Sequence, residues 1–178
     1  MTDTQKKPLW KNELVWLFLL TSGLFAILYS KFILGGYAYV FTDTGADTMQ
    51  INYAQYGLFS SLFRSGESGY VLQAGLGMDV SSYYPAYLIP YNLLILLAPQ
   101  RLLPWAVLAS AYLKMITISL VGYLFYRKLM QDGIGTMAAA LAWTFSGYVI
   151  LWGQHYGFCT CMALFTVCLL YTSPSPRD

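Results

Sequence analysis

Long apolar runs without charge constrain this chain more than any other feature of its sequence. Only eleven charged residues lie between Leu14 and Leu170, and long stretches between them carry none. A helix needs about 20 consecutive apolar residues to cross a bilayer. Charged residues make up 10% of the chain, whereas soluble domains contain about 25%. We therefore predict an all-α, polytopic membrane protein, and the net charge of +2 gives no reason to expect a nucleic-acid partner.

The distribution of lysine and arginine sets the expected topology. Three lysines precede the first apolar run, and Arg127 and Lys128 follow the second. Cytoplasmic segments are enriched in these residues, so both places are predicted to be cytoplasmic. The predicted order is a cytoplasmic N-terminus (1–13), a first span (14–35), a large extracytoplasmic loop (36–101), a second span (102–126), a cytoplasmic loop (127–133), a third span (134–153) and the start of a fourth (158–167).

The segment 83–98 is the ambiguous part of this topology. It is apolar but short, and Pro85 and Pro90 interrupt it. If it crossed the membrane, Arg127 and Lys128 would fall on the outer side, against the positive-inside rule. We therefore predict an interfacial or re-entrant segment. Nine of the sixteen tyrosines lie in the loop 36–101, which is typical of a segment at the membrane–water boundary.

Residues 46–64 have the pattern of an amphipathic helix that lies on the membrane surface. Ile51, Leu58 and Leu62 form an apolar stripe, and neighbouring aromatic residues widen it. The predicted extracytoplasmic loop therefore contains an interfacial helix.

Two carboxylates lie near the expected start of this helix. Asp47 and Gln50 are three residues apart, hence neighbours on a helix surface, and Asp43 lies just before them. The two carboxylates suit a divalent cation, or one of them suits a general base. A structural explanation is also open, because Thr44 and Asp47 have the spacing of a capping box. Acids near a helix N-terminus contribute about 0.3–1 kcal/mol to stability.

Lys114 lies near the middle of the predicted second span. A lysine at the bilayer centre costs about 2.5–3.5 kcal/mol on insertion scales, and the Val, Leu, Ile and Phe residues of 104–125 offset this by about 3–5 kcal/mol. The helix can therefore insert, but the ammonium needs a partner or a polar cavity. A contact to a lipid phosphate or acidic substrate and a structural ion pair are both open.

Two further motifs carry less weight. His155, Cys159 and Cys161 form an H-x3-C-x-C pattern, but the sequence shows no fourth ligand, so no metal site is predicted. Ser146 and Gly147 are small residues in the third predicted span, where they favour a close helix–helix contact.

The last eleven residues differ in kind from the rest of the chain. The stretch 168–178, CLLYTSPSPRD, back-translates without a mismatch to the end of a transposase adaptor used in shotgun sequencing. We therefore expect it to be an artefact after a truncation near Val167, and exclude it from fold reasoning. The natural protein would then be longer, and the fragment itself is expected to be inactive.

An ordered set of short motifs resembles the YfhO family of bacterial membrane proteins. The resemblance covers residues 11–167. The motifs are Gly45-x-Asp47-x-x-Gln50, GLGMD (75–79), YYPAYLIPYNLL (83–94), the LK pair that ends at Lys114, YLFYRKL (123–129) and SGYVILWGQH (146–155). YfhO proteins are similar to the glycosyltransferase C class, so the resemblance implies a multi-pass sugar transferase that acts outside the bacterial cytoplasmic membrane.

The resemblance also implies substrates and residue roles. The donor would be a polyprenyl-phosphate-linked sugar, and the acceptor a cell-wall polymer such as a teichoic acid. By position, Asp47 matches the acid that activates the acceptor hydroxyl, with Asp43 as a second carboxylate and Gln50 as a substrate-binding neighbour. Lys114 would suit the anionic lipid phosphate. The segment HYGFCTCM after the third span departs from the family pattern.

A non-catalytic transporter, lipid-handling or assembly subunit is the alternative. Lys114 would then line a translocation path, and Asp47 would cap a helix. Broken helices in matching halves are typical of transporters. The acids of the first half of this chain lie in the predicted external loop, which favours the transferase.

Overall fold

The computed structural model describes residues 12–40, 52–67, 69–72, 77–79, 90–130 and 132–152. These parts are mainly helical, which confirms the helical fold expected from the apolar runs. The strands β1 (Tyr70–Val71) and β2 (Met78–Asp79) pair as a short antiparallel hairpin. The helical segments are α1 (Glu13–Leu28), α2 (Ser30–Leu34), α3 (Ala54–Ser65), η4 (Pro90–Asn92), α5 (Leu93–Leu97), η5 (Gln100–Leu102), α6 (Leu103–Leu129), α7 (Gly133–Thr144) and α8 (Gly147–Trp152).

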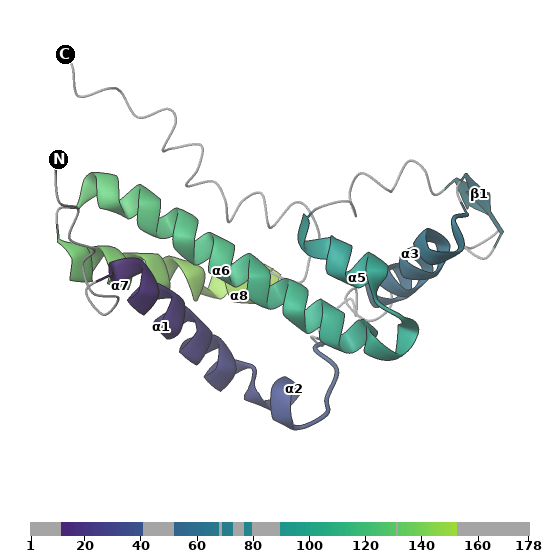
Figure 1. Cartoon of the computed structure of the whole chain (residues 1–178), viewed down its shortest axis with the longest axis horizontal. Helices are drawn as coiled ribbons and strands as arrows, with labels where there is room; N and C mark the ends of the chain where they lie inside the picture. Colours follow the sequence, from purple (N-terminus) through teal and green to yellow (C-terminus); the bar gives the residue numbers. More distant parts are fainter. Residues whose placement is uncertain are drawn as a thin grey trace, which may run out of the picture.

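The longest helix, α6, contacts α1, η4, α5, η5 and α7, and both α1 and α7 lie along it (Figure 1). Its first turn contains Pro104, where a missing N–H leaves no bond unmade, and its last turn contains Arg127 and Lys128, which favour the negative end of the helix dipole. Two helical stretches, Gln100–Leu129 with 30 residues and Gly133–Leu151 with 19, are long and apolar enough to cross a bilayer.

The first and third apolar runs each form two helices. In the first run, α1 starts at the cap of Asn12, whose side chain accepts from the Leu14 N–H at 3.0 Å, and it ends before Tyr29. In the third run, α7 ends at Thr144 and α8 begins at Gly147. A break inside a uniformly apolar run hardly changes the hydropathy, so the sequence pattern predicts one unbroken helix in each run.

The close helix contact expected at Ser146 and Gly147 is not found there. The Ser146 hydroxyl accepts from the Val149 N–H at 3.4 Å, which caps α8, and no atom of the described residues lies within 4 Å of a Cβ placed on Gly147. The close approach lies at Gly122 of α6, where such a Cβ would be 3.7 Å from Ala140 Cα of α7. Ser146 serves as a helix cap. The sequence pattern does not show this role, because Ser146 lies between two apolar stretches.

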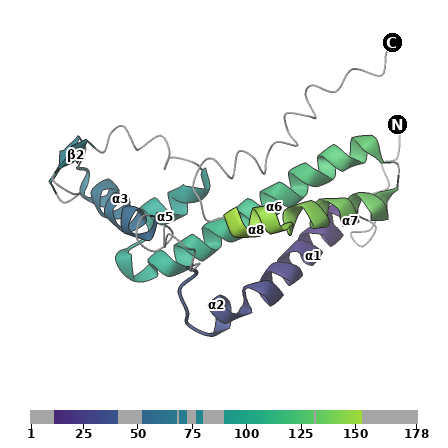
Figure 2. The ribbon, with the colours of Figure 1, turned by 180° about the vertical axis from the view of Figure 1, so that it is seen from behind.

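The helices α1, α6 and α7 lie side by side in both views of the chain (Figures 1 and 2). Two hydroxyl pairs join α1 to α6: Thr21 to Ser119 at 2.8 Å, and Ser22 to Tyr112 at 2.8 Å. The outward face of α1 carries exposed apolar side chains, among them Trp16. A bundle that pairs its polar groups inside and exposes apolar ones outside suits a lipid environment.

At the other end of the fold, α5 and α6 form a helical hairpin, and α3 packs against it. The Ser60 hydroxyl donates to the Ala98 carbonyl at 2.7 Å, and the Gln100 amide donates to the Gly57 carbonyl at 2.8 Å. The buried side chains of α3 include Tyr56, Phe59 and Leu62. This part of the face predicted to lie on the membrane is therefore buried within the protein, because α5 offers it an apolar surface. Residues 46–51 of the predicted helix lie outside the described residues.

Candidate functional site

Of the four residues predicted to form the site, the structure describes one. Asp43, Asp47 and Gln50 lie outside the described residues. Lys114 lies in the middle of α6 and is 7% exposed. It takes part in an interaction within the chain. A cation is thus held inside the protein on a helix of membrane-spanning length, as its place in the sequence predicts.

Lys114 belongs to one buried stripe along α6. The stripe also contains Leu103, Val107 and Ser110, at helical spacings of four, three and four residues. Side chains of a helix lean toward its N-terminus, so a long lysine side chain covers the turn before its own Cα. For Lys114 that turn contains Ser110. We therefore expect the Lys114 ammonium to lie near the Ser110 hydroxyl.

The short helix η4 brings an asparagine to α6. Asn92 ends η4, contacts between η4 and α6 join the two elements, and the Asn92 side chain is fully buried. Within the part of the chain that the structure describes, neither its amide nitrogen nor its amide oxygen has a hydrogen-bond partner, and the same holds for the Ser110 hydroxyl. We call Asn92, Ser110 and Lys114 the buried polar set.

The geometry of the α5–α6 hairpin explains why these residues belong together. Asn92 precedes the end of α5 at Leu97 by five residues, or about 8 Å at the rise of an α-helix. Ser110 follows the start of α6 at Leu103 by seven residues, or about 10 Å. Because the two helices run back along each other from a short connection (Figure 1), Asn92 and Ser110 lie at nearly the same level of the hairpin.

Two more polar groups near the start of α3 are buried without a partner. The Asn52 side chain is 2% exposed, and neither its amide nitrogen nor the Tyr53 hydroxyl makes a hydrogen bond with another described residue. Burial raises the pKa of Tyr53 to about 12, because the phenolate would lose its hydration. Tyr53 packs against the apolar cluster that contains Ile95 and Leu96 of α5. The start of α3 thus carries two polar groups with buried atoms that no described residue bonds.

The opposite end of the helix bundle has a fully bonded polar cluster. The Tyr123 hydroxyl donates to the Glu13 carboxylate, and Arg127 lies 3.3 Å from the same carboxylate. This carboxylate also lies directly against Gly133, so a side chain at that position would displace it. One acid therefore joins the start of α1, the end of α6 and the start of α7. We call Glu13, Tyr123 and Arg127 the paired cluster.

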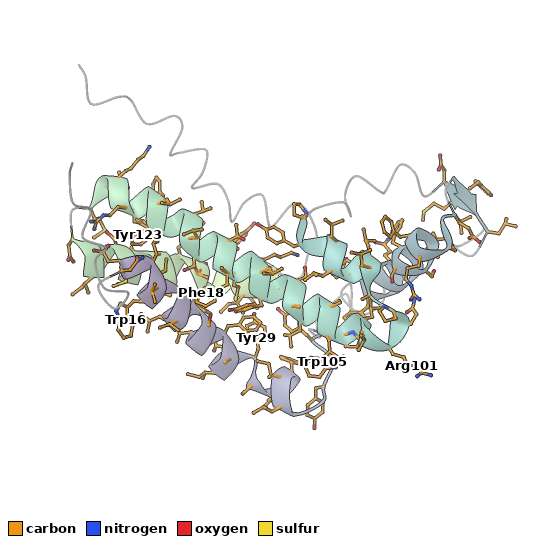
Figure 3. All side chains as sticks on the ribbon, viewed as in Figure 1. Trp16, Phe18, Tyr29, Arg101, Trp105 and Tyr123 are labelled. Atoms are coloured by element: carbon orange, nitrogen blue, oxygen red, sulfur yellow. The ribbon has the colours of Figure 1, made fainter. Side chains whose placement is uncertain are left out.

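Two cavities lie along α6 among the described residues. One, of about 160 Å³, is lined by the end of α2, the segment after it and the first turns of α6, with Phe32, Tyr39 and Trp105 in its wall. Trp105 lies beside α2, whereas Arg101 points outward from the turn before α6 (Figure 3). The other, of about 100 Å³, lies between α1 and α6. Among the described residues, neither cavity has a charged side chain in its wall.

Among the described residues, no group of three or more His, Cys, Asp or Glu side chains could hold a metal ion. The carboxylates proposed for a divalent cation, Asp43 and Asp47, lie outside these residues, as do His155, Cys159 and Cys161.

Comparison with known proteins does not indicate a function for this chain. No family model, curated protein or solved structure matches the chain. The resemblance to YfhO proteins stays a prediction that depends on the order of short motifs.

The sequence predicts a role for Lys114, which stays a prediction, and assigns none to Asn92 or Ser110. Their signals are visible in retrospect. Asn92 lies within the uncharged stretch YYPAYLIPYNLLILL, and Ser110 precedes Lys114 by one helical turn. Because serine is common in helices within membranes and asparagine is common in turns, neither signal is specific.

Proposed function

We propose that the chain acts as an integral membrane glycosyltransferase-like protein of the bacterial cytoplasmic membrane. It would move a sugar from a polyprenyl-phosphate donor to a cell-wall polymer of the teichoic-acid type on the outer face. The observation that carries this proposal is the buried Lys114, which lies one helical turn after the buried Ser110 in a helix of membrane-spanning length. Lipid-linked phosphate is an anion that such a site can receive from within the bilayer.

Multi-pass topology is part of the proposal, and the paired cluster supports it. The bond from Glu13 to Arg127 brings the start of α1 and the end of α6 to the same end of the bundle. An even number of crossings between these residues explains this arrangement, with both ends in the cytoplasm by the positive-inside rule. The helix α5 has five residues, about 8 Å long, which is far too short to cross a bilayer of about 30 Å.

In the proposed reaction, Asp47 acts at the acceptor hydroxyl and Lys114 acts at the phosphate of the donor. The acceptor hydroxyl gives its proton to the carboxylate of Asp47 as its oxygen attacks the anomeric carbon of the sugar. The bond from that carbon to the phosphate oxygen breaks, and polyprenyl phosphate leaves as an anion whose charge Lys114 stabilises. Gln50 would bind substrate beside Asp47. Asp43 would serve as a second carboxylate, alone or with a divalent cation.

The decisive experiment is transfer by the complete protein in membranes with Asp47→Asn. A general base contributes about 10²–10⁴-fold, so we expect the rate to fall by that factor while insertion stays unchanged. Asp79→Asn is the matched control, because Asp79 is an exposed acid of the same predicted loop. Transfer by Asp47→Asn at the wild-type rate would disprove the assignment.

A transporter or lipid-handling subunit is the second candidate, because a buried lysine also suits a translocation path. This candidate predicts that Asp47→Asn leaves lipid translocation intact and Lys114→Met abolishes it. Reconstituted vesicles that report flipping of a labelled prenyl phosphate distinguish the two candidates.

A further inference from the structure

The Asn92 amide and the Ser110 hydroxyl are both buried without a hydrogen-bond partner among the described residues. Asn92 is fully buried, and Ser110 is 1% exposed. A buried donor or acceptor left without a hydrogen bond destabilises the fold by about 1–3 kcal/mol. Such groups usually have a structural or functional reason, because most buried polar groups in folded proteins are bonded.

The charge around these groups selects the class of ligand. The segment 90–129, which forms η4, α5, η5 and α6, contains four cationic residues and no Asp or Glu. One of the four, Lys114, is buried on the same stripe as Ser110. Arg101 points outward, and Arg127 and Lys128 lie in the last turn of α6, where Arg127 pairs with Glu13. Lys114 is therefore the cation that shares the stripe with Ser110, and a buried cation favours an anion over a metal cation.

The hydrogen-bonding chemistry narrows the class further. An asparagine amide offers two N–H donors, a serine one O–H donor and a lysine up to three N–H donors. A phosphoryl group presents three acceptor oxygens with negative charge, and hydrogen bonds to it are charge-assisted and strong. The donors of the buried polar set therefore match an oxyanion with several oxygens.

We propose that Asn92, Ser110 and Lys114 together bind a phosphoryl group, with Asn92 and Ser110 as direct ligands. The proposal deepens the role of Lys114 and rests on that part of the proposed function. The phosphoryl group belongs either to a prenyl phosphate that enters from the bilayer or to free phosphate.

Native mass spectrometry of the purified full chain tests this proposal. The probes are farnesyl phosphate, farnesol and inorganic phosphate, each titrated against wild type, Asn92→Leu, Ser110→Ala and Lys114→Met. We expect wild type to bind one phosphorylated probe, with binding weakened about 10–100-fold in Asn92→Leu and Ser110→Ala, because each loses a bond to a charged group. Preference for farnesyl phosphate over inorganic phosphate assigns the group to a lipid, and the reverse preference assigns it to free phosphate.

The chain offers a matched control in Ser119→Ala. Ser119 lies on the same helix and is 2% exposed, but its hydroxyl is bonded to Thr21. We expect this variant to bind like wild type. Equal binding by Ser110→Ala, Asn92→Leu and wild type would overturn the proposal, as would equal binding of farnesol and farnesyl phosphate.

The same data separate this proposal from the proposed catalysis. If the phosphorylated probe binds as expected and Asp47→Asn still transfers sugar, the transferase assignment fails and the phosphoryl site stands. If Asp47→Asn abolishes transfer and Asn92→Leu binds normally, the transferase stands and the phosphoryl site fails.

Discussion

Near the C-terminal end of α6 the interior polar side chains have partners in the helix bundle, whereas near the α5–α6 hairpin several have none. Thr21 and Ser119 share a hydrogen bond, and Tyr123 and Arg127 both contact Glu13. By contrast, Asn92 and Ser110 are buried with unbonded polar atoms. A single helix thus carries two polar regions that differ in bonding rather than in composition.

The difference in hydrogen bonding suggests different roles for the two polar regions of α6. Bonds between helices hold a bundle together only when both partners are present. Unbonded buried groups do the opposite, because they weaken the fold until something binds them. We therefore assign the paired cluster and the Thr21–Ser119 bond to stability, and the buried polar set to binding. Substitutions in the two regions should then change stability in opposite directions.

The largest loss of stability is expected from Glu13→Ala. This change removes the acceptor of the Tyr123 hydroxyl, a charge-assisted bond worth about 1.5–3 kcal/mol. The ion pair with Arg127 adds little, because 45% and 36% of the two side chains are exposed. Denaturant unfolding in detergent should show a free energy lower by about 2 kcal/mol. Glu13→Gln, which keeps an acceptor, should lose less, and equal losses would show that the charge alone matters.

A smaller loss is expected from Thr21→Val. The substitution leaves the buried Ser119 hydroxyl without its partner and should lower the free energy of unfolding by about 1 kcal/mol. In a double-mutant cycle, Ser119→Ala in the Thr21→Val background should then have almost no further effect. Strictly additive losses would contradict a direct bond between the two hydroxyls.

Asn92→Leu should change stability in the other direction. Leucine has nearly the shape of asparagine and brings no unbonded polar atoms into the buried position. Without ligand, we expect the free energy of unfolding to rise by a few tenths to about 1 kcal/mol. A loss comparable to that of Thr21→Val would show that the Asn92 amide is bonded in the folded protein.

The smallest effect at neutral pH is expected from Tyr53→Phe, since the lost hydroxyl makes no hydrogen bond. Its effect should appear at alkaline pH. The pKa of Tyr53 is about 12 in the folded protein, whereas a tyrosine in the unfolded chain has a pKa of about 10. The neutral phenol therefore favours the fold fully below pH 10, and this contribution is lost as the pH rises toward 12. Tyr53→Phe should lose less stability than wild type between these pH values, and parallel curves would contradict burial of the phenol.

The sequence predicts those parts of the fold that depend on apolar length and on rare residues. The uncharged run around Lys114 corresponds to α6, and the lysine is conspicuous because a cation in such a run needs a reason. The breaks after Leu28 and Thr144 lie inside apolar runs, where hydropathy does not record them. The same holds for α3, whose amphipathic pattern cannot distinguish a membrane surface from the apolar face of α5.

The candidate site is only half visible in the sequence, for a physical reason. A charge in an apolar run is costly whatever surrounds it, so Lys114 can be identified without a structure. The significance of Asn92 and Ser110 depends on whether their hydrogen bonds are made, which only a three-dimensional arrangement decides. Asp43, Asp47 and Gln50 remain sequence-based predictions.

Ligand-induced stabilisation of the two serine variants tests most directly whether the region around Asn92 and Ser110 is the binding site. Thermal unfolding of wild type, Ser110→Ala and Ser119→Ala is measured with and without farnesyl phosphate. A ligand at a hundred times its dissociation constant stabilises a fold by about 2.7 kcal/mol. We predict that wild type and Ser119→Ala gain this stabilisation and that Ser110→Ala gains much less. An equal gain in both serine variants, or none in wild type, would contradict the division of α6 into a structural and a binding region.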